Sequence, residues 1–239
     1  MADVHDIEVI VFDVLGTLVD EATGLRAALR DAALRPGEAS GGTADAASVD
    51  ALLALWQRHR ATEERRIAEG RRAYANSEAI DAEAAQRVAD RAGLTDPAAV
   101  ARLATAGQRL PAWGDSATGL DRLARRFAVI GLSNASRTAL LRLSAHAGLR
   151  WHQALSGEAV RAYKPTPEIY RFAIDTAGRP PERMLMVAAH AWDLRAAQQR
   201  GMRTAYVQRP GGDPPTGADA FDWQCDGLDE LAALLTAAG

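Results

Sequence analysis

The sequence EVIVFDVLGTLV, residues 8–19, decides the fold of this chain. Residues 8–12 form a short apolar run rich in β-branched side chains, which is typical of a buried strand. Asp13 stands at the carboxyl end of that run, and Gly16 and Thr17 follow in the turn. A carboxylate at the end of a buried strand is a candidate for chemistry, although taken alone Asp13 is better explained as a helix cap.

The segment after this strand predicts helices. From Glu21 to Val100 the chain is rich in Ala, Leu, Arg and Glu and has no β-branched run. An amphipathic helix is expected over 48–69, with apolar residues including Trp56 on one side. A second helix is expected over 77–92, and a third begins near residue 97. This part of the chain therefore has the composition of a helical insert.

Beyond residue 111, strand-like runs alternate with helical ones. Strands are expected at 127–132, 153–155, 184–188 and 204–207, and helices at 137–147, 167–177, 193–200 and the C-terminus. Alternation at this spacing predicts an α/β protein with a Rossmann-like parallel sheet. The first strand has no partner until after the helical stretch. We therefore predict a core domain over 1–19 and 99–239 and a small helical cap domain over 20–98.

The composition limits the classes of function. The chain has 239 residues, of which 48% are hydrophobic and 25% charged, and its net charge of -3 gives no basic face for nucleic acid. The lone Cys225 fits a reducing compartment, and the N-terminal apolar run is too short and too interrupted for a signal peptide or membrane span. We expect a cytoplasmic protein with a small-molecule substrate and no nucleic-acid or membrane partner. A homodimer is possible.

Polar side chains follow several of the predicted strands. Ser133 and Asn134 follow one strand, and His190 and Asp193 follow another. Because ligands bind at the carboxyl ends of parallel strands, these side chains and Asp13 are expected to share one crevice. Each alone has a structural explanation as a helix cap or core residue, but their order along the chain favours a common site.

Lysine is almost absent from this sequence. Lys164, in a proline-bounded loop, is the only lysine among 28 basic residues. A compact ammonium can do work that the broad guanidinium of arginine cannot, so Lys164 is a candidate for the same site. The alternative, a chance survivor of a bias toward arginine, is equally compatible with composition alone.

Four motifs together resemble those of the haloacid dehalogenase superfamily. FDVLGTL at 12–18 resembles the first motif and LSN at 132–134 the second. YKP at 163–165 looks like the third, and VAAHAWD at 187–193 occupies the place of the fourth. The resemblance covers essentially the whole chain, and it implies that the segment at 20–98 is the cap of such enzymes.

Two positions decide between branches of that superfamily. Its phosphatases carry a second acid two residues after the nucleophile and two acids in the fourth motif that help to hold Mg²⁺. Here Leu15 and Ala189 replace two of these acids, and only Asp193 remains. The 2-haloacid dehalogenase branch lacks the same acids, because halide leaves without a proton. The resemblance therefore implies a metal-independent, cofactor-free hydrolytic dehalogenase that converts short 2-haloalkanoic acids into 2-hydroxy acids and halide.

The resemblance also implies roles for individual residues. Asp13 is the expected covalent nucleophile, Lys164 keeps it ionised, and Asp193 orients or deprotonates the hydrolytic water. Thr17 and Ser133 are expected to donate hydrogen bonds that position Asp13 or the substrate. The predicted substrate-binding residues, which include an apolar wall and a group for the departing halide, are Asn134, Leu15, Arg58, Tyr170, Trp192 and His190.

Some positions depart from the branch it resembles. A cap arginine that binds halide is expected after a helical tryptophan, but Gln57 follows Trp56 here. Arg58 or Arg60 could take that role, or both could be solvated charges. His190 stands where asparagine is more common, so its role is open. The alternatives are a phosphatase of a small phosphate ester and a catalytically weakened binding protein.

Overall fold

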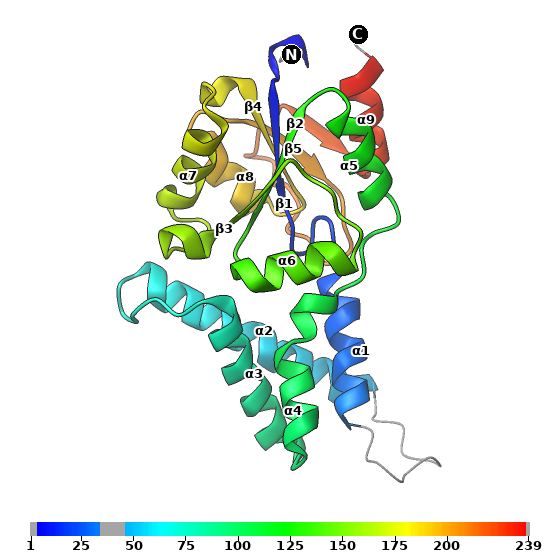
Figure 1. The fold of residues 1–239 in the computed structure, drawn as a ribbon, viewed down its shortest axis with the longest axis vertical. Helices are drawn as coiled ribbons and strands as arrows, with labels where there is room; N and C mark the ends of the chain where they lie inside the picture. The colour runs from blue at the N-terminus through cyan, green and yellow to red at the C-terminus, as the bar shows by residue number, and fades with distance from the viewer. Residues whose placement is uncertain (1–3, 34–45, 238–239) are drawn as a thin grey trace.

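A single parallel sheet forms the centre of the molecule (Figure 1). The computed structural model describes residues 4–33 and 46–237. The six strands lie in the order β3-β2-β1-β4-β5-β6. Their bounds are β1 Val9–Asp13, β2 Ala128–Ser133, β3 Gln153–Ser156, β4 Met184–Ala188, β5 Arg203–Val207 and β6 Trp223–Cys225. The order changes direction at β1, so the crevice between β1 and β4 is the topological switch point where such sheets bind ligands.

Helices cover both faces of the sheet (Figure 1). One face packs against α5 Ser116–Ala124, α6 Arg137–His146 and α9 Leu228–Ala237. The other packs against α7 Pro167–Ala177 and α8 Ala191–Gln198. Short 3-10 turns lie at Val4–Asp6, Ala106–Arg109, Gly157–Val160 and Pro181–Arg183. This layered arrangement leaves the strand ends as the place where loops meet.

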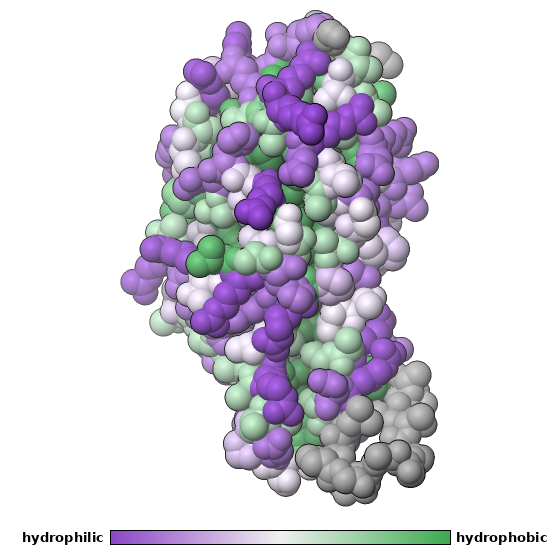
Figure 2. Space-filling model, turned by 45° about the vertical axis from the view of Figure 1, so that its right-hand side comes forward, coloured by the Kyte–Doolittle hydropathy of each residue, from purple (hydrophilic) through white to green (hydrophobic). Residues whose placement is uncertain are grey.

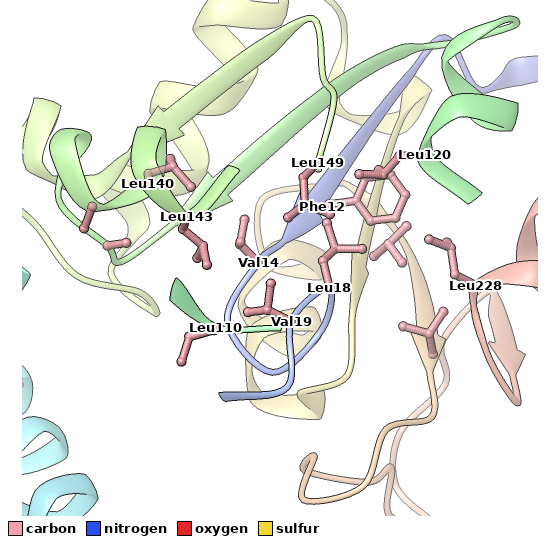
Figure 3. Close-up of a cluster of buried hydrophobic side chains, with 14 of the residues drawn as sticks. Phe12, Val14, Leu18, Val19, Leu110, Leu120, Leu140, Leu143, Leu149 and Leu228 are labelled. Atoms are coloured by element: carbon pink, nitrogen blue, oxygen red, sulfur yellow. The ribbon is translucent and has the colours of Figure 1, made fainter. Parts of the chain in front are cut away.

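The central strand is buried on both faces. Ile10 and Phe12 belong to the hydrophobic cluster on one side of the sheet, and Val9 and Val11 belong to the cluster on the other. Side chains of a strand alternate between faces, so an uninterrupted apolar run is what a doubly covered strand needs. Figure 3 shows Phe12 among leucines from the neighbouring elements. The strand therefore holds Asp13 on a rigid support.

Four helices, which we call the cap helices, lie beyond the carboxyl end of β1 (Figure 1). They are α1 Glu21–Ala33, α2 Ala46–Ala68, α3 Ser77–Ala92 and α4 Pro97–Ala104. The buried apolar residues of α2, such as Trp56, join the same cluster as the core face that carries Phe12. Helix α4 spans the predicted boundary at 98/99 and packs on α1 and α3. The division into core and cap domains stays a prediction.

The predicted fold class is confirmed, and most predicted elements lie within two residues of the observed ones. Strand β6 and helix α5 were not predicted. Helix α8 begins at Ala191, two residues earlier than expected.

The surface in Figure 2 mixes hydrophilic and weakly hydrophobic side chains. In the described ranges, no helix is both long and apolar enough to cross a membrane. The large hydrophobic side chains that stand exposed in those ranges are Leu141, Trp192 and Leu234. These scattered side chains do not define an interface, and the homodimer stays a prediction.

Candidate active site

The site is built from the carboxyl ends of β1 and β4 and the loops that follow them. Asp13 is the last residue of β1, and His190 lies two residues after β4. Asp193 lies in the first turn of α8, and Lys164 lies in the loop before α7. The structure brings all four side chains together, as the sequence predicted.

A buried ammonium links the two acids of the site. Nζ of Lys164 donates to Oδ1 of Asp13 at 2.9 Å and to Oδ2 of Asp193 at 2.7 Å. All three residues are at most 5% exposed. An ammonium with three donors on a flexible stem fits this narrow space, whereas a guanidinium is wider and planar. The chain's only lysine is therefore a site residue.

The electrostatics of this trio favour an ionised Asp13. Burial would raise the pKa of Asp13, but Lys164, His190 and Thr17 outweigh burial and hold that pKa below its ordinary value. Burial raises the pKa of Asp193 above its ordinary value despite the same ammonium. Burial would lower the pKa of Lys164, and the two carboxylates overcome this and raise it. The environment thus favours the ionised form of Asp13 and makes Asp193 the more basic of the two acids.

Two further contacts orient Asp13. Oγ1 of Thr17 donates to Oδ2 of Asp13 at 2.7 Å and accepts the backbone N–H of Ala189 at 2.9 Å. Nδ1 of His190 lies 3.1 Å from the same Oδ2. Burial lowers the pKa of His190, but its contact with Asp13 raises it overall. The carboxylate of Asp13 is thereby held by Thr17, His190 and Lys164.

Gly16 makes room for His190. Its φ is 78°, in the left-handed region that glycine adopts without cost. A Cβ at this position would lie 2.7 Å from Cε1 of His190. The glycine of the first motif therefore allows both the turn and the close approach of the imidazole.

Tyr170 supports Asp193 from behind. Its hydroxyl donates to Oδ1 of Asp193 at 2.5 Å, and both residues are fully buried. We predicted that Tyr170 belongs to an apolar wall of the site. The structure differs, because α7 points the Tyr170 hydroxyl toward Asp193. Trp192 and Leu15 do line the cavity.

The residues at the end of β2 have different roles. Oδ1 of Asn134 accepts the backbone N–H of Lys164 at 2.7 Å, which fixes the lysine loop. Nδ2 of Asn134 donates to Oε2 of Glu64 at 3.3 Å. Oγ of Ser133 accepts the N–H of Ala135, and Asp13 is not among its described contacts. Ser133 is thus placed beside the site, and its predicted bond to Asp13 stays a prediction.

A small cavity of about 260 Å³ lies over Asp13, between the core and the cap helices. Its core side combines the polar residues Asp13, Asn134, Lys164 and His190 with Leu15 and the exposed Trp192. The lining residues are Asp13, Leu15, Glu21, Gln57, Arg60, Glu64, Asn134, Lys164, His190 and Trp192. A cavity of this size suits a molecule of few atoms.

The cap wall of the cavity holds one arginine among three acids, which we call the Arg60 cluster. Arg60 contacts Glu21 through Nη1, Oε1 of Glu64 at 3.6 Å through Nη2, and Oδ1 of Asp81 at 3.2 Å through Nε. Burial raises the pKa of Glu64 to about 7 and that of Asp81 to about 6, although Arg60 opposes both shifts. The guanidinium of Arg60 therefore does not offset the burial of Glu64 and Asp81.

The structure places Arg58 elsewhere. Arg58 is exposed and lines a separate hollow with Val49 and Arg91, because neighbours on a helix point about 100° apart. Its predicted substrate-binding role is therefore wrong for this structure. Gln57, Arg60 and Glu64 share the inward face of α2.

Sequence reasoning missed Glu21 and Glu64 as cavity residues. The signal for Glu64 was the spacing of 57, 60 and 64, which are three and four residues apart on one helix face. The sequence held no comparable signal for Glu21, which begins a different helix, α1.

Comparisons with known proteins agree with this geometry. A family model for haloacid dehalogenase-like hydrolases matches residues 7–201. An (S)-2-haloacid dehalogenase 4A from Burkholderia cepacia is 29% identical over 241 residues, which covers 97% of this chain and 96% of that protein. An (S)-2-haloacid dehalogenase from Pseudomonas putida is 28% identical and covers 87% of each chain.

Solved structures show the same likeness. The crystal structure of an L-2-haloacid dehalogenase has a TM-score of 0.83 at 28% identity and covers 97% of this chain and 99% of its own. The L-2-haloacid dehalogenase from Xanthobacter autotrophicus with chloropropionic acid covalently bound has a TM-score of 0.77 at 26% identity, with coverages of 96% and 98%.

Proposed function

Because this chain belongs to the haloacid dehalogenase-like hydrolase family, we propose that it hydrolyses the carbon–halogen bond of small 2-haloacids or their close derivatives. The reaction proceeds through an ester on Asp13. The observation that carries this proposal is the ammonium of Lys164 between Asp13 and Asp193, at the floor of a small cavity. The relatives support it, since they include (S)-2-haloacid dehalogenases and one structure with covalently bound chloropropionic acid.

In the first step, a carboxylate oxygen of Asp13 attacks the carbon that carries the halogen. A carbon–oxygen bond forms as the carbon–halogen bond breaks, and halide leaves with the bonding electron pair. Halide needs no proton on departure, so Leu15 can stand where a phosphatase keeps an acid. The low pKa of Asp13 keeps the attacking group ionised.

In the second step, water attacks the carbonyl carbon of the Asp13 ester and breaks its bond to the alkoxy oxygen. The products are a 2-hydroxy compound, regenerated Asp13 and one proton. Asp193 does not line the cavity, so we assign it the proton through Lys164: Nζ gives one proton to Asp193 as it takes one from the attacking water, and Lys164 ends the step as an ammonium again. Once Asp13 is an ester it has no charge, and Asp193 is left as the carboxylate partner of Lys164. Its raised pKa suits a base.

The residues of the site do not fit Mg²⁺. Magnesium needs oxygen ligands in near-octahedral array, and here Leu15 and Ala189 provide none from their side chains. The ammonium of Lys164 occupies the position between Asp13 and Asp193 where a cation would bind. This argues for a metal-independent reaction and against the alternative phosphatase.

The test is to trap the ester. Asp193→Asn and wild-type protein are exposed to L-2-chloropropionate in EDTA, with free halide and intact mass as readouts. We expect halide from the wild type, a mass adduct on the Asp13 peptide in Asp193→Asn, and neither in Asp13→Asn. Halide release without an Asp13 adduct, or loss of activity in EDTA that Mg²⁺ restores, would contradict the mechanism.

A further inference from the structure

The cations that line the cavity are already paired with acids. Among the described residues of the lining, Lys164 is held by Asp13 and Asp193, and Arg60 is held by its three acids. The side chain of Lys164 is 1% exposed. A substrate carboxylate entering the cavity would therefore have to compete with a carboxylate already bound to each cation.

The charges around the cavity are unbalanced. Three carboxyl groups line it, those of Asp13, Glu21 and Glu64, and two more, those of Asp81 and Asp193, contact the lining cations Arg60 and Lys164 from behind. These five acids are set against Arg60, Lys164 and His190. With every acid ionised and His190 protonated, these groups carry a net charge of -2, and protonation of Glu64, whose pKa is raised to about 7, reduces it to -1. In a partly buried cavity such charges are weakly screened, so they repel an anion at short range.

An uncharged substrate is not repelled by the carboxylates around the cavity. When Asp13 attacks an uncharged 2-halo compound, its own negative charge passes to the halide, and the cavity holds the same charge as before. A 2-haloalkanoate brings one further negative charge, which remains through both steps. The difference in electrostatic repulsion between the two substrates is therefore set by the charged residues of the cap wall and not by the charge transferred in the reaction.

The cap wall also offers acceptors for a donor on the substrate. Glu21 and Glu64 line the cavity opposite Asp13, and Oε2 of Glu64 already accepts the side-chain amide of Asn134. An amide N–H₂ on a substrate is a donor of the same chemistry. Gln57, which lines the same wall, adds an uncharged amide in place of a cation.

We propose that the Arg60 cluster is a specificity determinant that favours uncharged, hydrogen-bond-donating 2-halo compounds, of the 2-haloalkanamide class, over free 2-haloalkanoates. This inference rests on the proposed function, because it concerns the substrate of the same Asp13 reaction. Glu64 is the group to alter, since it lines the cavity and shares Arg60 with two other acids.

The experiment compares kcat/KM for L-2-chloropropionamide and L-2-chloropropionate in wild type and Glu64→Gln, with halide release as the readout. We expect the wild type to prefer the amide by about tenfold or more. Glu64→Gln removes a charge that repels the acid and weakens an acceptor for the amide, so it should raise kcat/KM for the acid about tenfold, lower it for the amide, and thereby reduce the amide-to-acid ratio. Glu69→Gln is the matched control, because Glu69 is an exposed acid just beyond the end of α2. It should leave the ratio unchanged.

The wild type provides a second readout that needs no variant. Glu64 has a pKa of about 7 through burial, and protonation removes one charge from the wall. The acid-to-amide ratio should therefore rise as pH falls from 8 to 6, and the rise should be smaller in Glu64→Gln, where only Asp81 and His190 still change charge. A preference for the acid that neither pH nor the variant alters would overturn the inference and leave the proposed function standing. No halide and no Asp13 adduct from either substrate would overturn both.

Discussion

The hydroxyl of Tyr170 donates to Oδ1 of Asp193 at 2.5 Å without reaching the cavity. Burial raises the pKa of Asp193, and the Tyr170 hydrogen bond counteracts part of that rise. Tyr170→Phe should raise the pKa of Asp193 further, so Asp193 becomes protonated at a higher pH. The acidic limb of the profile of kcat against pH should therefore shift to higher pH. We expect kcat at pH 6 to fall about tenfold, because a hydrogen bond to a charged group contributes about 1.5–3 kcal/mol.

The profile of kcat against pH distinguishes this role from general damage to the fold. Tyr206→Phe is the control, since Tyr206 lies on β5 and its described contacts include neither Asp13 nor Asp193. A uniform loss of kcat in Tyr170→Phe with no displaced limb would show that the hydroxyl only supports packing.

At the scale of an element, the turn after β1 depends on Gly16. Gly16→Ala would force a Cβ to within 2.7 Å of His190 and keep a positive φ of 78°. The positive φ alone costs about 1 kcal/mol, and the forced contact adds about 1–3 kcal/mol and displaces His190 from Asp13. We expect lower Tm and lower kcat, measured by thermal unfolding and halide release.

Gly70→Ala separates the two causes. Gly70 has a φ of 68°, and a Cβ added there would meet no atom within 4 Å, so this variant carries the backbone cost alone. If the two variants lose equal stability and Gly16→Ala keeps full kcat, then the contact with His190 has no importance.

The individual elements show which parts of the structure could be predicted from the sequence. Strands β1 and β4 were predictable because both are apolar runs buried on two faces, and they fix Asp13 and His190 at neighbouring strand ends. Strand β6 was missed because it has three residues at the sheet edge, one of them exposed. The inward face of α2 was misjudged because packing of Trp56 sets the rotation of the helix, and this turns Arg60 toward Asp13 and Arg58 away.

At the scale of the whole molecule, the Arg60 cluster makes stability depend on pH. Burial raises the pKa of Glu64 to about 7 and that of Asp81 to about 6, whereas both have ordinary values near 4 in the unfolded chain. At pH values between the unfolded and the folded pKa values of Glu64 and Asp81, the folded state binds more protons than the unfolded state. The free energy of unfolding therefore falls as pH rises from about 5 to about 7. His190, with its raised pKa, contributes in the same direction.

Removing one acid should therefore stabilise the protein at high pH. Glu64→Gln keeps the shape of the side chain and cannot ionise, so at pH 8 it should raise the free energy of unfolding by about 2 kcal/mol and have little effect at pH 5. Urea unfolding at the two pH values measures this, with Glu69→Gln as the exposed control. The lowered pKa of Asp13 acts in a separate window, because its stabilising contribution is lost only as pH falls below the ordinary aspartate value. A Glu64→Gln variant less stable than wild type at pH 8 would mean that Glu64 stabilises Arg60 more than its burial costs, and that the cluster is a structural ion network.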